Sequence, residues 1–115
     1  METYLDEIDD EIMVLVADGG LDARNARQLG EKLEALVDAG IRELIVDCSK
    51  LTFVSSAGLG VLLKANRQLG ALGGQVHLAG VGGPIVQILR IARLDGILKL
   101  HEDVGRAKHA LRKHS

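Results

Sequence analysis

The chain has 115 residues, which is enough for one domain with its own hydrophobic core but too short for a second independent one. Its 14 basic and 16 acidic residues give a formal net charge of −2, so its charge provides no drive toward nucleic acid or anionic lipid. Hydrophobic residues make up 47% of the chain with one Phe and one Tyr, so the core is expected to be aliphatic.

The cysteine count and the first residues bear on where the protein works. The single cysteine, Cys48, cannot form an internal disulfide, and its neighbours do not activate a thiolate, so it is expected to be a packed, inert residue. The acidic amino terminus lacks the profile of a signal peptide, and no run approaches the roughly 20 apolar residues that cross a bilayer. The expectation is a cytoplasmic protein with no direct contact to membrane or nucleic acid.

Strand-like and helix-like patterns alternate along the chain. Strands are predicted over residues 3–8 and 11–18, which form an edge hairpin, and over 43–48, 51–54, 75–79 and 97–100. Helices are predicted over residues 22–40, 56–69, 84–92 and 104–111, the first with Asp22 as N-cap and Gly40 as stop. This order predicts an α/β (mixed α+β) fold: one domain over residues 1–115, with a central mixed sheet of about four to five strands packed by about four helices.

Two adjacent serines stand where the segment over residues 51–63 changes from strand to helix. Ser55 and Ser56 therefore occupy the N-cap region of the helix, where unpaired backbone N–H groups and the helix dipole favour negative charge. A phosphate on either serine would find a partly prepared environment. From these residues alone, a plain capping role for one serine is favoured over a phosphorylation switch.

The same helix carries a stripe of polar and small residues opposite its leucine-rich face. Ser56, Gly60, Lys64 and Arg67 recur on it at three- and four-residue spacing, with Gln68 as an alternative last member. Gly60 is unfavourable in a helix by about 1 kcal/mol relative to Ala, so it marks either a close approach by another backbone or a tolerated surface glycine. The two interpretations are equally weighted.

Catalytic, metal and cofactor signatures are scarce. The histidines show no paired spacing suited to zinc: His77, His101, His109 and His114. The segment around Ser56 lacks the first glycine of a nucleophile elbow, and the glycines of residues 80–83 lack the residues that complete a phosphate-binding loop. The prediction is a non-enzymatic recognition module with no catalytic residue, no metal and no cofactor.

Three segments carry a family resemblance: residues 19–22 (Gly-Gly-Leu-Asp), residues 44–47 followed by 51–63, and residues 94–98 (Leu-Asp-Gly-Ile-Leu). Over nearly its full length the chain resembles the STAS domain family, specifically the bacterial anti-sigma factor antagonists. That resemblance implies that Ser56 is phosphorylated by a partner anti-sigma factor that is itself a serine kinase. Ser55 stands at a usually acidic position, and Ala57 stands where family members have a hydroxyl residue. Asp22 matches an acidic residue near the family's partner-binding surface.

The resemblance implies a partner switch. The unphosphorylated form binds the anti-sigma factor and releases the sigma factor, and phosphate at Ser56 blocks that contact; a phosphatase is the expected counterpart of the kinase. The expected partner-binding residues are Asp22, Ser55, Ser56, Gly58, Gly60, Lys64 and Arg67. Two alternatives stay open: a phosphorylation-independent scaffold subunit, for instance of a lipid-transport ATPase, and a small-ligand sensor that uses the loop over residues 80–83. Homodimerisation also stays open.

Overall fold

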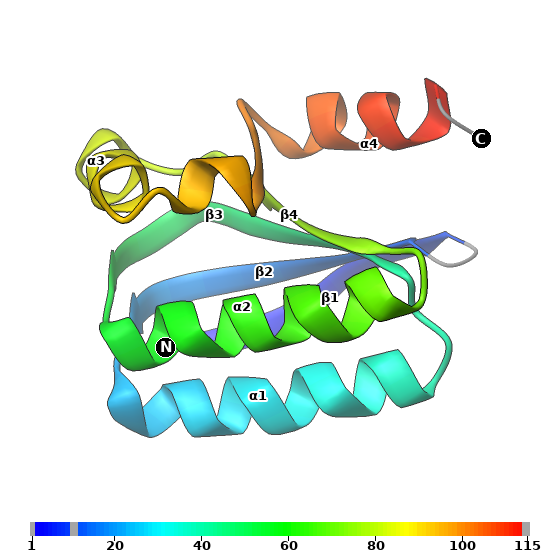
Figure 1. Cartoon of the computed structure of the whole chain (residues 1–115), viewed down its shortest axis with the longest axis horizontal. Coiled ribbons are helices and arrows are strands. Elements are labelled where there is room, and N and C mark those ends of the chain that lie inside the picture. The colour runs from blue at the N-terminus through cyan, green and yellow to red at the C-terminus, as the bar shows by residue number, and fades with distance from the viewer. Residues whose placement is uncertain (1, 10–11, 114–115) are drawn as a thin grey trace.

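The protein folds into one mixed sheet with helices on both faces, as the computed structural model in Figure 1 shows for residues 2–9 and 12–113, the residues that the structure describes. The elements in chain order are β1 (Glu2–Asp9), β2 (Ile12–Leu21), α1 (Ala23–Asp38), β3 (Glu43–Val54), α2 (Ser56–Ala71), β4 (Gln75–Ala79), α3 (Gly83–Ile91), the short 3₁₀ helix η1 (Leu94–Gly96), β5 (Lys99–His101) and α4 (Val104–Lys113). The α/β class predicted from the alternation is confirmed.

The five strands lie side by side in chain order, β1 to β5. β1 pairs antiparallel with β2, which confirms the predicted edge hairpin, although the turn at residues 10 and 11 lies outside the described residues. All later pairs are parallel, and each parallel pair requires a crossover segment, here supplied by α1 between β2 and β3 and by α2 between β3 and β4. The predicted mixed sheet is therefore correct.

Side chains alternate between the two faces of the sheet, and each face has its own core. The larger core joins inward residues of β2, β3 and β4 to α1, α2 and α3, whose buried members include Leu29, Leu62 and Leu89. The smaller core joins Val14, Ile45 and Ala79 to Ala107 of α4 on the opposite face. In Figure 1, α1 and α2 run side by side on one side of the sheet and α4 lies on the other.

Several predicted strands have different bounds in the structure. β2 extends past residue 18 to Leu21, because its pairing with β3 continues through Gly19 and Gly20. The segments 43–48 and 51–54 form one strand, β3, because its pairing with β2 continues past the polar residues 49 and 50 through two shifts of register. β5 begins at Lys99 instead of residue 97, because the backbone N–H groups of Ile97 and Leu98 both donate to the carbonyl of Leu94 in the turn of η1. These differences depend on strand pairing and on the turn of η1, and the local sequence pattern encodes neither.

Candidate functional site

The amino termini of α1 and α2 lie beside each other at one end of the strands. β2 and β3 are parallel neighbours, so their carboxyl ends lie at the same end of the sheet, where each strand runs directly into its helix. The backbone N–H of Ser55 donates to the carbonyl of Leu21 over 2.8 Å and ties the two strand ends together. Two helix dipoles therefore present their positive ends next to each other, at the left of Figure 1.

Asp22 is the N-cap of α1. Its carboxylate accepts hydrogen bonds of 2.9 Å from the backbone N–H groups of Arg24 and Asn25, and the Asn25 side chain accepts in return from the Asp22 backbone. The Asn25 bond, supported by that of Arg24, holds the pKa of the exposed Asp22 carboxyl below its ordinary value. The predicted N-cap is confirmed, and the exposed carboxylate is a negative charge at the edge of the surface around Ser56.

The two serines have different positions in α2. Ser55 is the N-cap: it is half-buried, and its Oγ accepts a 3.1 Å hydrogen bond from the backbone N–H of Gly58. Ser56 is the first residue of the helix, and its side chain is exposed. The capping role thus belongs to Ser55, while Ser56 provides the exposed side chain.

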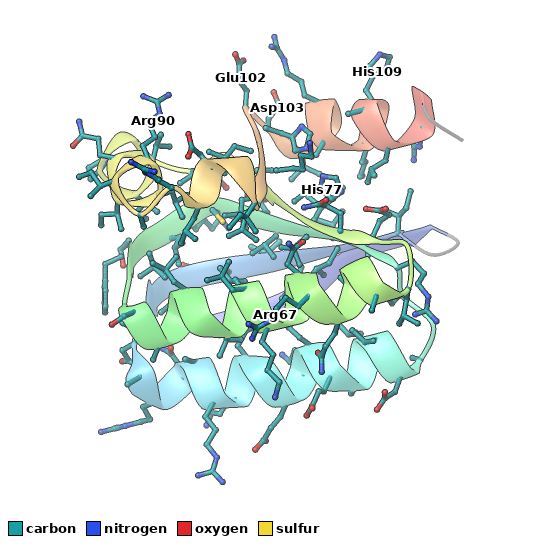
Figure 2. All side chains as sticks on the ribbon, in the orientation of Figure 1. Arg67, His77, Arg90, Glu102, Asp103 and His109 are labelled. Atoms are coloured by element: carbon teal, nitrogen blue, oxygen red, sulfur yellow. The ribbon has the colours of Figure 1, made fainter. Side chains whose placement is uncertain are left out.

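The predicted stripe on α2 lies on the outer surface. Ser56, Gly60, Lys64 and Arg67 are all exposed, and Figure 2 shows Arg67 projecting from α2. The Lys64 ammonium lies 3.9 Å from the carboxylate of Glu34 on α1, but both side chains are more than half exposed, so this pair adds little to stability. The stripe is therefore open to a partner along three turns of helix.

Gly58 faces the opposite way from the other predicted partner-binding residues. It is buried, and a Cβ atom there would lie 2.5 Å from Cγ of Leu21 and 3.0 Å from Cγ2 of Val54. Gly60 has open space beside it: apart from its chain neighbours and the backbone of its own helix, no atom of the described residues lies within 4 Å of a Cβ built on it. The described residues of this chain therefore do not supply the close backbone approach that was considered for Gly60. Gly58, in contrast, allows α2 to pack closely against the ends of β2 and β3.

These two glycines should respond oppositely to the same substitution. Gly58→Ala is expected to lower the free energy of unfolding by about 1–3 kcal/mol, because the new methyl group overpacks the contact with Leu21. Gly60→Ala is expected to raise it by about 1 kcal/mol, because alanine favours the helix and meets no neighbour. Urea unfolding followed by circular dichroism measures both changes. An equal response of the two variants would contradict the packing described here.

The interior holds a polar chain that the sequence did not reveal. The Nε2 atom of His77 lies 2.7 Å from Oε2 of Glu43, and its Nδ1 atom lies 3.0 Å from Nε2 of His101. The three residues come from β3, β4 and β5, so only the strand order brings them together. The polar His77 between Val76 and Leu78 was the available signal, and its partners lie 34 and 24 residues away. Among residues 2–9 and 12–113, no group of three or more His, Cys, Asp or Glu side chains is arranged to hold a metal ion.

Cys48 is packed in the larger core with 2% of its surface exposed. Burial, with a contribution from the charge of Asp47, raises the pKa of its thiol to about 12. A thiol with such a pKa carries almost no thiolate at neutral pH. The predicted inert, packed role of Cys48 is confirmed.

The loop over residues 80–83 borders a depression of about 250 Å³, which is lined by Val81, Val86, Arg90, Leu100, His101 and Glu102. Val81 is the loop residue in that lining, and Figure 2 shows Arg90 and Glu102 at the outer surface. A small-ligand role for this loop stays a prediction.

The chain belongs to the STAS domain family: the model of the STAS domain matches residues 4–107. This family assignment confirms the resemblance carried by residues 19–22, 44–63 and 94–98. STAS domains of this kind are regulatory modules, and their family is generally non-enzymatic. Within the described residues, none of the helices is long and apolar enough to cross a membrane.

Several proteins similar to this chain are described as anti-sigma factor antagonists. BtrV of Bordetella bronchiseptica, a candidate anti-sigma factor antagonist, is 32% identical over 92 residues, which cover 80% of this chain and 78% of BtrV. A candidate anti-sigma factor antagonist from Thermotoga maritima has the same fold, with a TM-score of 0.90 at 20% identity over 96% of this chain and 94% of that one. The Bacillus protein SpoIIAA, solved in its phosphorylated form, has a TM-score of 0.77 at 20% identity over 96% of this chain and 99% of its own.

Proposed function

We propose that this domain is an anti-sigma factor antagonist whose binding to a serine-kinase anti-sigma factor is switched off by phosphorylation of Ser56. The observation that carries the proposal is the division between the two serines: Ser55 is engaged as the N-cap, while Ser56 is exposed on the first turn of α2. The similarity to BtrV, and to SpoIIAA with its phosphorylated form, supports the same role. In this proposal residues 1–115 act as one cytoplasmic domain, which is the substrate of an enzyme.

The proposed partner surface consists of the exposed residues around the amino termini of α1 and α2. The anti-sigma factor would contact the exposed or half-buried residues of this surface, which are Asp22, Ser55, Ser56, Gly60, Lys64 and Arg67. Gly58 would act indirectly, because it allows α2 to pack closely against the strands. The open space at Gly60 leaves room for a partner's backbone to approach the helix closely. Binding of this surface would release the sigma factor held by the same partner.

A phosphate at Ser56 would act locally. It adds about −1.5 to −2 charges at neutral pH, and the first turn of a helix tolerates such charge because unpaired N–H groups and the dipole face it. The domain itself therefore stays folded while the contact acquires a charge that the partner does not neutralise. A phosphatase that removes the group would restore binding.

Phosphate transfer tests the proposal directly. The purified domain is incubated with ATP and, one at a time, with the serine-kinase anti-sigma factors of the source organism, and the products are mapped by mass spectrometry. We expect one phosphate on Ser56, and its loss in Ser56→Ala.

Ser55→Ala is the matched control for phosphate transfer. This change removes the cap and lowers the free energy of unfolding by about 1 kcal/mol, yet it should leave Ser56 a substrate. Phosphate on Ser55 would contradict the proposal, and so would an unmodified Ser56 in a complex with an active kinase.

A further inference from the structure

The single phenylalanine of the chain lies at the protein surface. Phe53 is 50% exposed, whereas the buried core consists of aliphatic side chains, Met13, Cys48 and one histidine. One exposed apolar side chain is ordinary in a folded protein, so exposure alone assigns no role to Phe53. What distinguishes this ring is its packing against Gly20 and its position three residues before Ser56 in the chain.

Phe53 lies across the backbone of Gly20. The two residues are register partners in the parallel pair of β3 and β2, and a Cβ atom on Gly20 would overlap Cδ1 and Cε1 of the ring. The ring therefore packs against the glycine and keeps the rest of its surface in solvent. A residue other than glycine at position 20 would push the ring out of this position.

Phe53 lies at the same end of the sheet as the amino termini of α1 and α2. Gly20 comes two residues before the N-cap Asp22, and Phe53 comes two residues before the N-cap Ser55. The hydrogen bond from Ser55 to Leu21 holds these strand ends together, so Phe53 stands at the end of the sheet from which both α1 and α2 begin. Phe53 thus lies at the same end of the sheet as Ser56, three residues before it in the chain.

We propose that the ring of Phe53 is an apolar anchor for the anti-sigma factor, which receives it in an apolar recess next to its contact with Ser56. The inference rests on the proposed function and adds to it a residue whose side chain contributes strongly to the affinity. Aromatic residues are enriched among the few side chains that dominate binding energies, and the contacts that surround such side chains in a complex exclude water. A ring that excludes water beside Ser56 also makes an added phosphate harder to accommodate.

The experiment compares affinities for the anti-sigma factor kinase that binds the wild-type domain, measured by calorimetry with a non-hydrolysable ATP analogue. Phe53→Ala is expected to weaken binding by about thirtyfold, the effect of losing an interface hot spot. Gly20→Ala keeps the ring but displaces it, so it should weaken binding in the wild-type background and have no further effect in Phe53→Ala.

Leu72 provides the matched control. It is also 50% exposed, but it caps the carboxyl end of α2, at the opposite end of the helix from Ser56. Leu72→Ala should bind as the wild type does. If Phe53→Ala binds within about threefold of the wild type while Ser56 is still phosphorylated, the anchor is wrong and the proposed function stands. If Phe53→Ala alters only self-association, the anchor is wrong as well. If no kinase binds the wild type, the proposed function fails, and the anchor fails with it.

Discussion

Ser56→Asp is expected to weaken binding of the anti-sigma factor by more than tenfold. A charge that is desolvated at the centre of an interface without a partner costs about 2–5 kcal/mol, and each 1.4 kcal/mol is about a factor of ten in affinity. Phosphoserine should have a larger effect than aspartate, because it carries nearly twice the charge. Titration calorimetry of the wild type, Ser56→Asp and the phosphorylated domain against the same kinase measures this order.

Ser55→Asp is the matched control for charge. It adds the same carboxylate one residue earlier, where aspartate caps a helix as well as serine does and can accept from the N–H of Gly58. The variant should keep the stability of the wild type. It should also keep most of its affinity, although Ser55 belongs to the proposed partner surface, because the family resemblance places an acidic residue at this position. Equal binding by all of these proteins, including the phosphorylated one, would favour a constitutive scaffold over a switch.

The helix around the site could be predicted because its signals are local. The 3.6-residue period placed Ser56, Gly60, Lys64 and Arg67 on one face, and all four are exposed as expected. Gly58 lies two residues beyond Ser56, a rotation of about 200° around the helix, which carries it to the inner face. The same period therefore indicates a packing role for Gly58, although Gly58 was predicted to bind the partner together with the exposed residues.

Contacts between distant segments could not be predicted in this way. β3 continues through residues 49 and 50 because it pairs with β2, although the polar side chains of these two residues interrupt the apolar pattern of a strand. The packing of the Phe53 ring likewise depends on Gly20, because the register between β2 and β3 places this glycine against the ring. Local periodicity gives the elements and their faces, while register decides which side chains from different strands meet.

His77 is expected to make the stability of the protein sensitive to acid. Burial, and then the positive charge of Lys99, lower the pKa of His77 from an ordinary 6.5 to about 4. The Glu43 carboxylate acts in the opposite direction but does not outweigh them. With both rings neutral, His77 can donate from Nε2 to Glu43 and accept at Nδ1 from Nε2–H of His101, which gives both ring nitrogens of His77 a partner. A proton added at Nδ1 of His77 would face that N–H.

The sign of the pH effect follows from the lowered pKa. Between pH 6.5 and about 4 the unfolded chain binds a proton at His77 and the folded protein does not, so stability falls as the pH falls through this window. The pKa of His101 is also lowered, by burial and by the charges of His77 and Lys99, and acts in the same direction. His77 alone should contribute a loss of about 3 kcal/mol.

Urea unfolding at several pH values between 7 and 4 measures this loss. His77→Gln removes the titrating ring, so the free energy of unfolding of this variant should fall by about 3 kcal/mol less than that of the wild type over the same window. His109 is the control, because it is exposed on α4 and points away from the sheet, while His77 lies between the sheet and α4 (Figure 2). His109→Gln should keep the wild-type dependence on pH. If His77→Gln keeps it too, the acid sensitivity comes from groups other than the chain of Glu43, His77 and His101.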